Sequence, residues 1–341
     1  MIVIGVLLIA AVIITLSNHF SASYDRLNDT DQRILSELEA YCKADSETSV
    51  WSGYALEDKP IMAINGALGT AYLVNPSNEI KSVFAQEIAM PEGSGMRVYR
   101  LSVLTPQVFP MRFDAGNFNT LGKSYSIFGN EVYFTRYAAK ESLDAQFSSK
   151  HYITFLTHEA FHYYMQDHWP DGGRFSEDLS GTDIDLIAEE YDVLAQIQSE
   201  LAESNPSKDA LLQSAKDYAD VMGRRLGANP QYLSAEISME TIEGTAQYVG
   251  IKASEIVGYD YGVMYFDNTK DVSFSDVIPA LRAEQIEQSF LADRMPYETG
   301  ALLCELLDAL RVDGWQERLN AQTKENPVTL YSVICDYLTV E

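Results

Sequence analysis

The segment KHYITFLTHEAFHYYMQ, residues 150–166, has the sequence pattern that best indicates the fold of this chain. It contains neither glycine nor proline, and its apolar residues recur at helical spacing, namely Ile153, Leu156, Ala160 and Tyr164. The sequence WPDGG at residues 169–173 would end any helix. The pattern therefore predicts a helix over residues 150–166, with His158, Glu159 and His162 mostly on the side opposite the apolar stripe.

Two histidines of this segment have the spacing of a pair of metal ligands. Residues four apart lie one turn apart on the same face of a helix, so His158 and His162 can offer imidazole nitrogens to one ion. Glu159 lies about 100° further round the helix, within reach of a water molecule at that ion. This H-E-x-x-H arrangement predicts a Zn²⁺ site with Glu159 as general base. A surface helix that merely carries two histidines is the alternative interpretation.

A catalytic zinc ion usually takes three protein ligands, so the third should come from another helix. Residues 231–257 are a predicted helix, with Pro230 before its start and Gly258 after its end. The polar side chains on one of its faces are Glu236, Glu240, Glu243 and Gln247. The alternative to a metal site is an acidic helix face that is exposed to solvent. Glu240 is an alternative ligand for the metal or for the amine of the substrate. Glu190 is the runner-up ligand. A hydrogen bond to a zinc-binding histidine and an ordinary salt bridge are equal alternatives for the partner of its carboxylate.

Two further segments resemble a known family. EGTAQY at residues 243–248 resembles the E-G-x-A-x-Y segment of gluzincin metallopeptidases, the group that includes alanyl aminopeptidases and leukotriene hydrolases. MPYETGALL at residues 295–303 resembles the P-Y-E-x-G-x-x-L-L stretch of those enzymes. The resemblance implies a zincin-like fold, with Glu243 as the third zinc ligand and the Tyr297 hydroxyl stabilising the tetrahedral intermediate. It implies a zinc-dependent metallopeptidase that hydrolyses a peptide or protein substrate.

The chain also departs from the family's pattern. Residues 163–242 separate His162 from Glu243, a longer interval than usual, and two predicted helices at 182–202 and 208–226 account for the excess. The G-x-M-x-N segment that grips the substrate's free amino end in the aminopeptidases is not found, so internal and terminal cleavage both stay open. A catalytically silent binding or assembly protein of the same fold, and a zinc hydrolase of a non-peptide substrate, are the alternative functions.

The chain is strongly acidic. Its 341 residues include 24 Lys or Arg and 50 Asp or Glu, which gives a formal net charge of −26. Such a surface repels phosphate backbones, so nucleic acid is not an expected partner. The cysteines are Cys42, Cys304 and Cys335, an odd number that leaves at least one outside any bridge within the chain. A Cys304–Cys335 disulfide stays open.

Residues 2–16 form an almost unbroken apolar run. A helix of this length spans only about 22 Å, short of a roughly 30 Å hydrocarbon core, which suits the apolar part of a secretory signal peptide. The small residues at 21–23 suit cleavage, and a retained membrane anchor is the equal alternative; a buried helix is the third. A signal peptide or a membrane anchor predicts that the protein is exported and lies in the periplasm or outside the cell.

The order of elements predicts an α+β fold, because strand patterns come first and helical patterns later. Strand candidates are residues 66–74, 79–89, 96–104 and 125–137, and the chain after Phe147 is predicted to be helical. Residues 130–135 resemble the edge strand that pairs with extended substrates in zincins, with a plain core strand as the equal alternative.

Three parts follow from these patterns. Residues 1–22 are expected to be a signal peptide or N-terminal anchor, residues 23–148 an α/β part with the substrate-edge strand, and residues 149–341 a helical zinc-binding part. Within the second part, residues 25–43 have a polar helical pattern that suits a spacer above a membrane.

Overall fold

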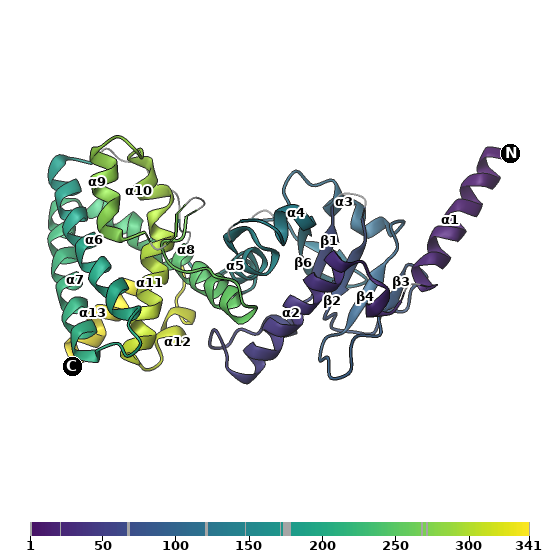
Figure 1. Ribbon diagram of the computed structural model, residues 1–341, viewed down its shortest axis with the longest axis horizontal. Helices are drawn as coiled ribbons and strands as arrows, with labels where there is room; N and C mark the ends of the chain where they lie inside the picture. Colours follow the sequence, from purple (N-terminus) through teal and green to yellow (C-terminus); the bar gives the residue numbers. More distant parts are fainter. Residues whose placement is uncertain are drawn as a thin grey trace. The chain divides into compact units, whose positions relative to one another are not determined.

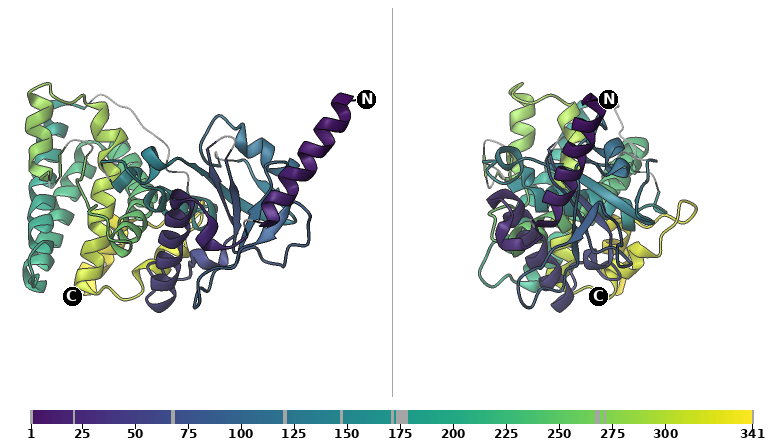
Figure 2. Two further views of the ribbon diagram at one scale, coloured as in Figure 1. Left: turned by 45° about the vertical axis from the view of Figure 1, so that its right-hand side comes forward. Right: turned by 90° about the vertical axis from the view of Figure 1, so that its right-hand side faces the viewer.

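The chain forms two compact units in the computed structural model (Figure 1 and Figure 2). The structure describes residues 2–20, 22–66, 69–119, 122–146, 148–170, 172, 179–266, 269–270 and 272–340. The first unit comprises Met1–Tyr163 and Ala253–Tyr259, and the second comprises Tyr164–Lys252 and Asp260–Glu341. The division falls inside two helices, α5 (Tyr152–Met165) and α8 (Pro230–Ile256).

A six-stranded sheet organises the first unit. Its strands are β1 (Ile61–Asn65), β2 (Ala71–Val74), β3 (Ala85–Glu87), β4 (Val98–Leu101), β5 (Tyr125–Ile127) and β6 (Asn130–Tyr137), in the spatial order β3-β4-β2-β1-β6-β5. β1 and β6 are parallel, with Ile61 opposite Tyr133, and the other neighbouring strands are antiparallel. Together with the helices after residue 148, this sheet confirms the α+β fold class.

The structure refines the predicted strands. β2, β3 and β4 lie within three of the predicted segments, but residues 125–137 form a hairpin that turns at Phe128 and Gly129, both with positive φ. β1 was not predicted. Its residues Ile61–Ile64 are all buried, so this strand lacks the alternation of polar and apolar residues that marks a half-exposed strand.

Strand β6 corrects the expectation of a substrate-binding edge at residues 130–135. It lies between β1 and β5, so it is not the edge of the sheet. Beyond the short β5, Phe118 forms a bridge with Thr135, and the Arg136 amide donates to the Asn117 carbonyl. Because both sides of β6 are paired, its backbone is not available for strand addition.

Helix α2 (Asp29–Glu47) packs in the first unit rather than serving as a spacer. Its apolar side chains Ile34, Leu35, Leu38 and Tyr41 are at most 1% exposed. Asp31, a buried residue in the first turn of α2, accepts hydrogen bonds with its carboxylate from the hydroxyls of Tyr72 (2.5 Å) and Tyr137 (2.7 Å) and from the Asn65 amide (2.7 Å). These bonds join α2 to strands β2 and β6 and to the end of β1, so the sequence predicted the helix but not its role.

The opposite face of the sheet carries an apolar core. It is formed by Met62, Ile64, Ala71, Leu73, Ala85, Tyr99, Leu101, Val132 and Phe134, with Ile127, Val108 and Met111. Val108 and Met111 come from the chain at helix α3 (Phe109–Arg112). Burial of this cluster stabilises the sheet by roughly 25 cal/mol per Å² of apolar surface.

The second unit is helical. Its helices are α6 (Gly181–Leu201), α7 (Lys208–Ala228), most of α8, α9 (Val277–Arg282), α10 (Ser289–Asp293), α11 (Met295–Leu310), α12 (Trp315–Asn320) and α13 (Leu330–Val340). The four long helices predicted from the sequence, α5 to α8, begin and end within two residues of their expected bounds. α6 starts with a capping box, in which Ser180 and Asp183 satisfy each other's backbone amides.

Helices α8 and α11 cross in backbone contact at two glycines. A Cβ built on Gly300 would lie 2.2 Å from the Glu240 carbonyl oxygen, and one built on Gly244 would lie 2.3 Å from the Gly300 Cα. Only glycine fits on both sides of such a crossing. The crossing places the segments 243–248 and 295–303 side by side within the second unit.

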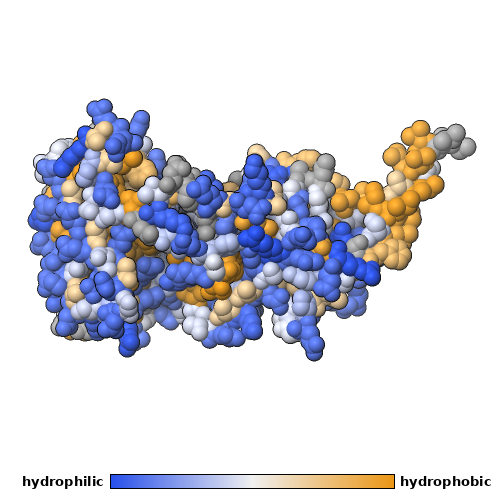
Figure 3. Space-filling model, viewed as in Figure 1, coloured by the Kyte–Doolittle hydropathy of each residue, from blue (hydrophilic) through white to orange (hydrophobic). Residues whose placement is uncertain are grey.

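The N-terminal helix α1 (Ile2–Phe20) is longer than the apolar run expected at 2–16. Its 18-residue window Val3–Phe20 has a mean hydropathy of 2.2, long and apolar enough to cross a membrane. Figure 3 shows a nearly continuous apolar surface along it. A short helix α4 (Ala139–Ser142) completes the first unit.

Candidate functional site

Helix α5 is held on the sheet by aromatic and polar contacts along its length. The Thr135 hydroxyl donates to the Tyr152 hydroxyl at 2.9 Å, and at the other end the Tyr163 hydroxyl donates to Glu131 at 2.7 Å. Between them, the Phe161 ring packs edge-on against Trp51 and Tyr54, with centroids 4.9 and 5.4 Å away. These contacts orient the helix, so that the opposite face presents the histidines.

The two histidines converge as their spacing predicts. The Nε2 atoms of His158 and His162 lie 3.2 Å apart, and both side chains are half-buried. Two ligands of one tetrahedral zinc ion, each bound at about 2.0–2.1 Å, have nitrogens about 3.3 Å apart. Two imidazole nitrogens at this separation fit the donor set of a zinc ion. Glu159, between them in sequence, is also half-buried and so accessible to water.

Glu243 and Tyr297 both belong to the second unit, on the two helices that cross at Gly244 and Gly300. Along α11, Tyr297 is half-buried whereas its neighbours Met295, Pro296 and Glu298 are buried. Glu243 is likewise half-buried. The chain therefore brings this carboxylate and this hydroxyl to helices in direct contact.

A buried ion pair supports Tyr297. Glu298 accepts hydrogen bonds from the Arg294 guanidinium at 2.9 Å and from the Met264 amide at 2.6 Å. Burial raises the pKa of Glu298, while Arg294 opposes that rise. The Arg294 guanidinium also lies 5.6 Å from the Tyr297 ring centroid, a cation–π distance. Because Glu298 holds Arg294, and Arg294 covers the ring, the tyrosine has a defined environment.

Gln166 is a residue that the sequence analysis overlooked. Its side-chain amide donates to the Ile242 carbonyl at 3.0 Å and to the Thr245 hydroxyl at 2.8 Å, on either side of Glu243. The signal was present, since residues 158, 162 and 166 recur every four positions in the segment 150–166 that was predicted to be helical. Gln166 directly follows α5 and binds, within the second unit, the part of α8 that carries Glu243.

The other candidate ligands have different partners. Glu190 and Glu236 both form buried ion pairs with Arg225, the latter at 2.5 Å. Burial raises the pKa of Glu190 to about 7, against the opposing charge of Arg225, and also raises that of Glu236. Glu190 is therefore part of a salt bridge rather than a metal site. Glu240 is 1% exposed, and burial raises its pKa well above the ordinary range, which favours a protonated carboxyl.

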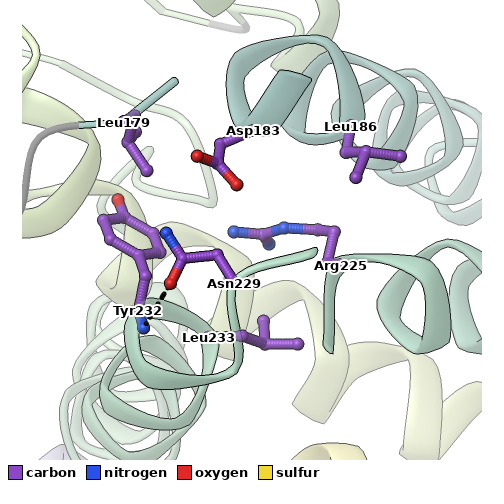
Figure 4. A pocket seen from close by; sticks show the side chains of 7 residues that line it. All are labelled: Leu179, Asp183, Leu186, Arg225, Asn229, Tyr232 and Leu233. Atoms are coloured by element: carbon purple, nitrogen blue, oxygen red, sulfur yellow. Dashed lines mark hydrogen bonds between the residues drawn. The ribbon is translucent and has the colours of Figure 1, made fainter. Parts of the chain in front are cut away.

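A small pocket opens beside this ion cluster (Figure 4). It is lined by Leu179, Asp183, Leu186, Arg225, Asn229, Tyr232 and Leu233. The Arg225 guanidinium points between Asp183 and Asn229 in this view but is already paired with the two glutamates. The Arg225 guanidinium is therefore not free to bind a ligand in this pocket.

The remaining histidines and the cysteines have ordinary roles. His151 is buried, and its ring contacts the Ala145 carbonyl at 2.9 Å. His168 contacts Asp167 and the Asn320 carbonyl. Cys304 and Cys335 are free thiols, so the bridge between them does not form.

Comparison of the chain with models of protein families, with curated proteins and with solved structures finds no match.

Proposed function

We propose that the chain is an exported zinc-dependent metallopeptidase of the gluzincin type with a zincin-like fold. In this proposal His158, His162 and Glu243 hold Zn²⁺. Glu159 is the general base, and Tyr297 stabilises the transition state. The substrate is a peptide or protein chain, and the apolar N-terminal helix directs the protein out of the cytoplasm.

The observation that carries the proposal is the 3.2 Å separation of the two histidine Nε2 atoms on one face of α5. Histidine pairs on helices also occur without a metal, so the second support is the side chain one turn further along. Gln166 binds α8 on both sides of Glu243, which favours convergence of this carboxylate with the histidines. The third support is that the segments 158–162, 243–248 and 295–303 follow one another in the order of the gluzincin family.

When bound at such a site, zinc supplies a Lewis acid that activates water near neutral pH and polarises a carbonyl group. The residues of the chain then move the protons. The Glu159 carboxylate takes a proton from the attacking water and delivers it to the nitrogen of the leaving amine. The Tyr297 hydroxyl donates a hydrogen bond to the substrate oxygen, which becomes negatively charged as the carbonyl carbon turns tetrahedral.

The environment of each group suits its role. Glu159 is half-buried and so reaches water, as a general base must. Tyr297 lies under the Arg294 guanidinium, whose positive charge favours an electron-rich oxygen nearby. Glu298, buried and bonded to Arg294 and to the Met264 backbone, keeps this arrangement in place.

Glu159→Gln tests the general base. The variant should still bind one zinc ion per chain, because the ligands are intact, but its turnover of a peptide library should fall by about 10² to 10⁴. Glu203→Gln, an exposed residue of the loop after α6, is the matched control and should behave like the wild type. Undiminished hydrolysis by Glu159→Gln would refute the role.

Tyr297→Phe tests the hydroxyl in the same assay. A lower kcat with little change in KM is expected, because the hydrogen bond forms only as charge develops. Tyr337→Phe is the control, since the Tyr337 hydroxyl has no hydrogen-bond partner among the residues that the structure describes. One zinc ion per chain without cleavage of any peptide would overturn the peptidase assignment. Cleavage of esters or amides of small metabolites instead would identify a non-peptide hydrolase.

A further inference from the structure

Helix α1 exposes apolar side chains on all of its faces. Its side chains Val3, Ile4, Val6, Leu7, Leu8, Ile9, Val12 and Ile13 are each between 57% and 70% exposed. Only 6% of the window Val3–Phe20 is buried. No Asp, Glu, Lys or Arg occurs from Ile2 to Phe20. A helix that is apolar all round is suited to neither water nor the plane of a membrane interface, where one face would be polar.

The length of α1 suits a lipid bilayer. The 16 residues before Asn18 span about 24 Å, and a bilayer with a roughly 30 Å hydrocarbon core thins locally around a helix that is a few ångströms shorter. A helix satisfies its own backbone hydrogen bonds, which a segment inside hydrocarbon requires. Acyl chains are therefore the partner that the exposed surface of α1 fits.

The end of α1 is built into the first unit. The Asn18 side chain is 5% exposed and donates to the Arg100 carbonyl of β4 at 3.2 Å. The His19 ring contacts the Gln86 side chain of β3 at 2.5 Å and the Val83 carbonyl at 3.2 Å. These polar contacts begin where the apolar run ends, and they exist only if the helix stays attached to the folded protein.

The chain just after α1 is also part of the fold. Ser23 forms a parallel bridge with Ala89, and the Ala89 amide donates to the Ala22 carbonyl at 3.1 Å. The Tyr24 amide donates in turn to the Ala89 carbonyl at 3.2 Å. Residues 22 and 23 belong to the segment whose small side chains suited signal cleavage, with residue 21 outside the described part of the chain. Cleavage here would remove the contacts of Asn18 and His19 and leave a loose end beside the sheet.

We propose that α1 is a retained transmembrane anchor, and that the β3–β4 side of the first unit lies at the bilayer surface. The loop next to the helix end suits this position. Val83 is 65% exposed, and its carbonyl contacts His19. The Lys81 side chain, two residues earlier, is 80% exposed and forms a surface ion pair with Glu79 at 3.3 Å. An apolar side chain can enter the interface, and a neighbouring ammonium group can reach lipid phosphates. Anchoring depends neither on zinc nor on hydrolysis.

The full chain, purified in detergent from membranes of expressing cells, provides the test. Its intact mass should include α1, and after reconstitution it should float with phosphatidylcholine vesicles and resist extraction at high pH. Leu8→Arg, which places a charge at mid-helix, should reduce the floated fraction about tenfold or more. Val340→Arg, at an 87% exposed apolar residue of α13, is the matched control and should float like the wild type.

Three outcomes would overturn the proposal. The first is a mature chain that starts near residues 22–24, which identifies a signal peptide. The second is an intact chain that stays out of the vesicles, and the third is a dimer that buries α1 against a second copy without lipid. Thermal unfolding of both variants should match the wild type, because Leu8 and Val340 are exposed outside the folded cores. Zinc content and peptidase activity play no part in these measurements, so the two proposals can fail separately.

Discussion

Replacing Gly300 with alanine should destabilise the second unit, because α8 and α11 touch there through their backbones. The added methyl group would lie 2.2 Å from the Glu240 carbonyl oxygen and 2.7 Å from the Gly244 Cα. Neither backbone atom can turn away as the end of a flexible side chain can. The helices must separate by about 1 Å, and forcing extra volume into a packed core costs about 1–3 kcal/mol.

The helical propensity of alanine opposes this effect. Alanine is favoured over glycine inside a helix by about 1 kcal/mol, so a glycine without close neighbours should be stabilised by the same change. Gly223 and Gly227 of α7 are such positions, since no atom of the described residues lies within 4 Å of a Cβ built on either. They are matched controls at exposed positions of a helix in the same unit.

Thermal unfolding followed by circular dichroism measures the difference. For a folded part of about 150–250 residues, each 1 kcal/mol shifts the midpoint by about 2–4 °C. The propensity gain of about 1 kcal/mol offsets part of the packing cost, so Gly300→Ala should unfold up to about 8 °C below the wild type, and Gly223→Ala a few degrees above it. A Gly300→Ala protein as stable as Gly223→Ala would refute the close crossing of α8 and α11. Since the crossing sets the spacing of Glu243 and Tyr297, turnover should fall in Gly300→Ala as well.

Three further predictions concern single side chains. His162→Ala should abolish stoichiometric zinc by elemental analysis, whereas His168→Ala should retain one ion per chain; one ion per chain in both would contradict the ligand set. Arg225→Met should lower the free energy of unfolding by about 3–5 kcal/mol, because it leaves two buried carboxyl groups without their cation, and an unchanged denaturation midpoint would contradict the ion cluster. Burial raises the pKa of Glu240 above its ordinary value of 4.5, so the folded state keeps a proton that the unfolded chain releases as the pH rises, and stability should fall above that pH. Glu240→Gln should flatten this decline and be more stable than the wild type at pH 8, with little difference near pH 4; superimposable pH profiles of unfolding would contradict it.

The long helices could be predicted from the sequence because their signals are local. Apolar residues at helical spacing, with proline and glycine at the ends, predicted α5 to α8 within two residues. The spacing of His158 and His162 is likewise a property of one helix. The helical pitch alone brings their nitrogens to 3.2 Å.

Other features depended on residues far apart in the chain. β1 is buried on both faces and so has no alternating pattern, and its parallel pairing with β6 joins segments about 70 residues apart. The same holds for α2, which looked like a polar spacer until the partners of Asp31 on the sheet were known. The prediction that residues 130–135 form an edge strand was also wrong because of residues distant in the chain. Residues 117–119 pair with the side of β6 that β5 leaves open.

The bounds of the long helices and the side chains that share a helix face could be predicted locally, since both follow from the repeat of a single helix. The residues that pack against those faces depend on the tertiary structure. It paired Glu190 with Arg225 from another helix, placed Gln166 against the segment around Glu243, and made Gly244 and Gly300 the crossing point of two helices. The partner of a buried polar group, or the space left by a glycine, is set by distant residues that pack against it, and no local pattern encodes that choice.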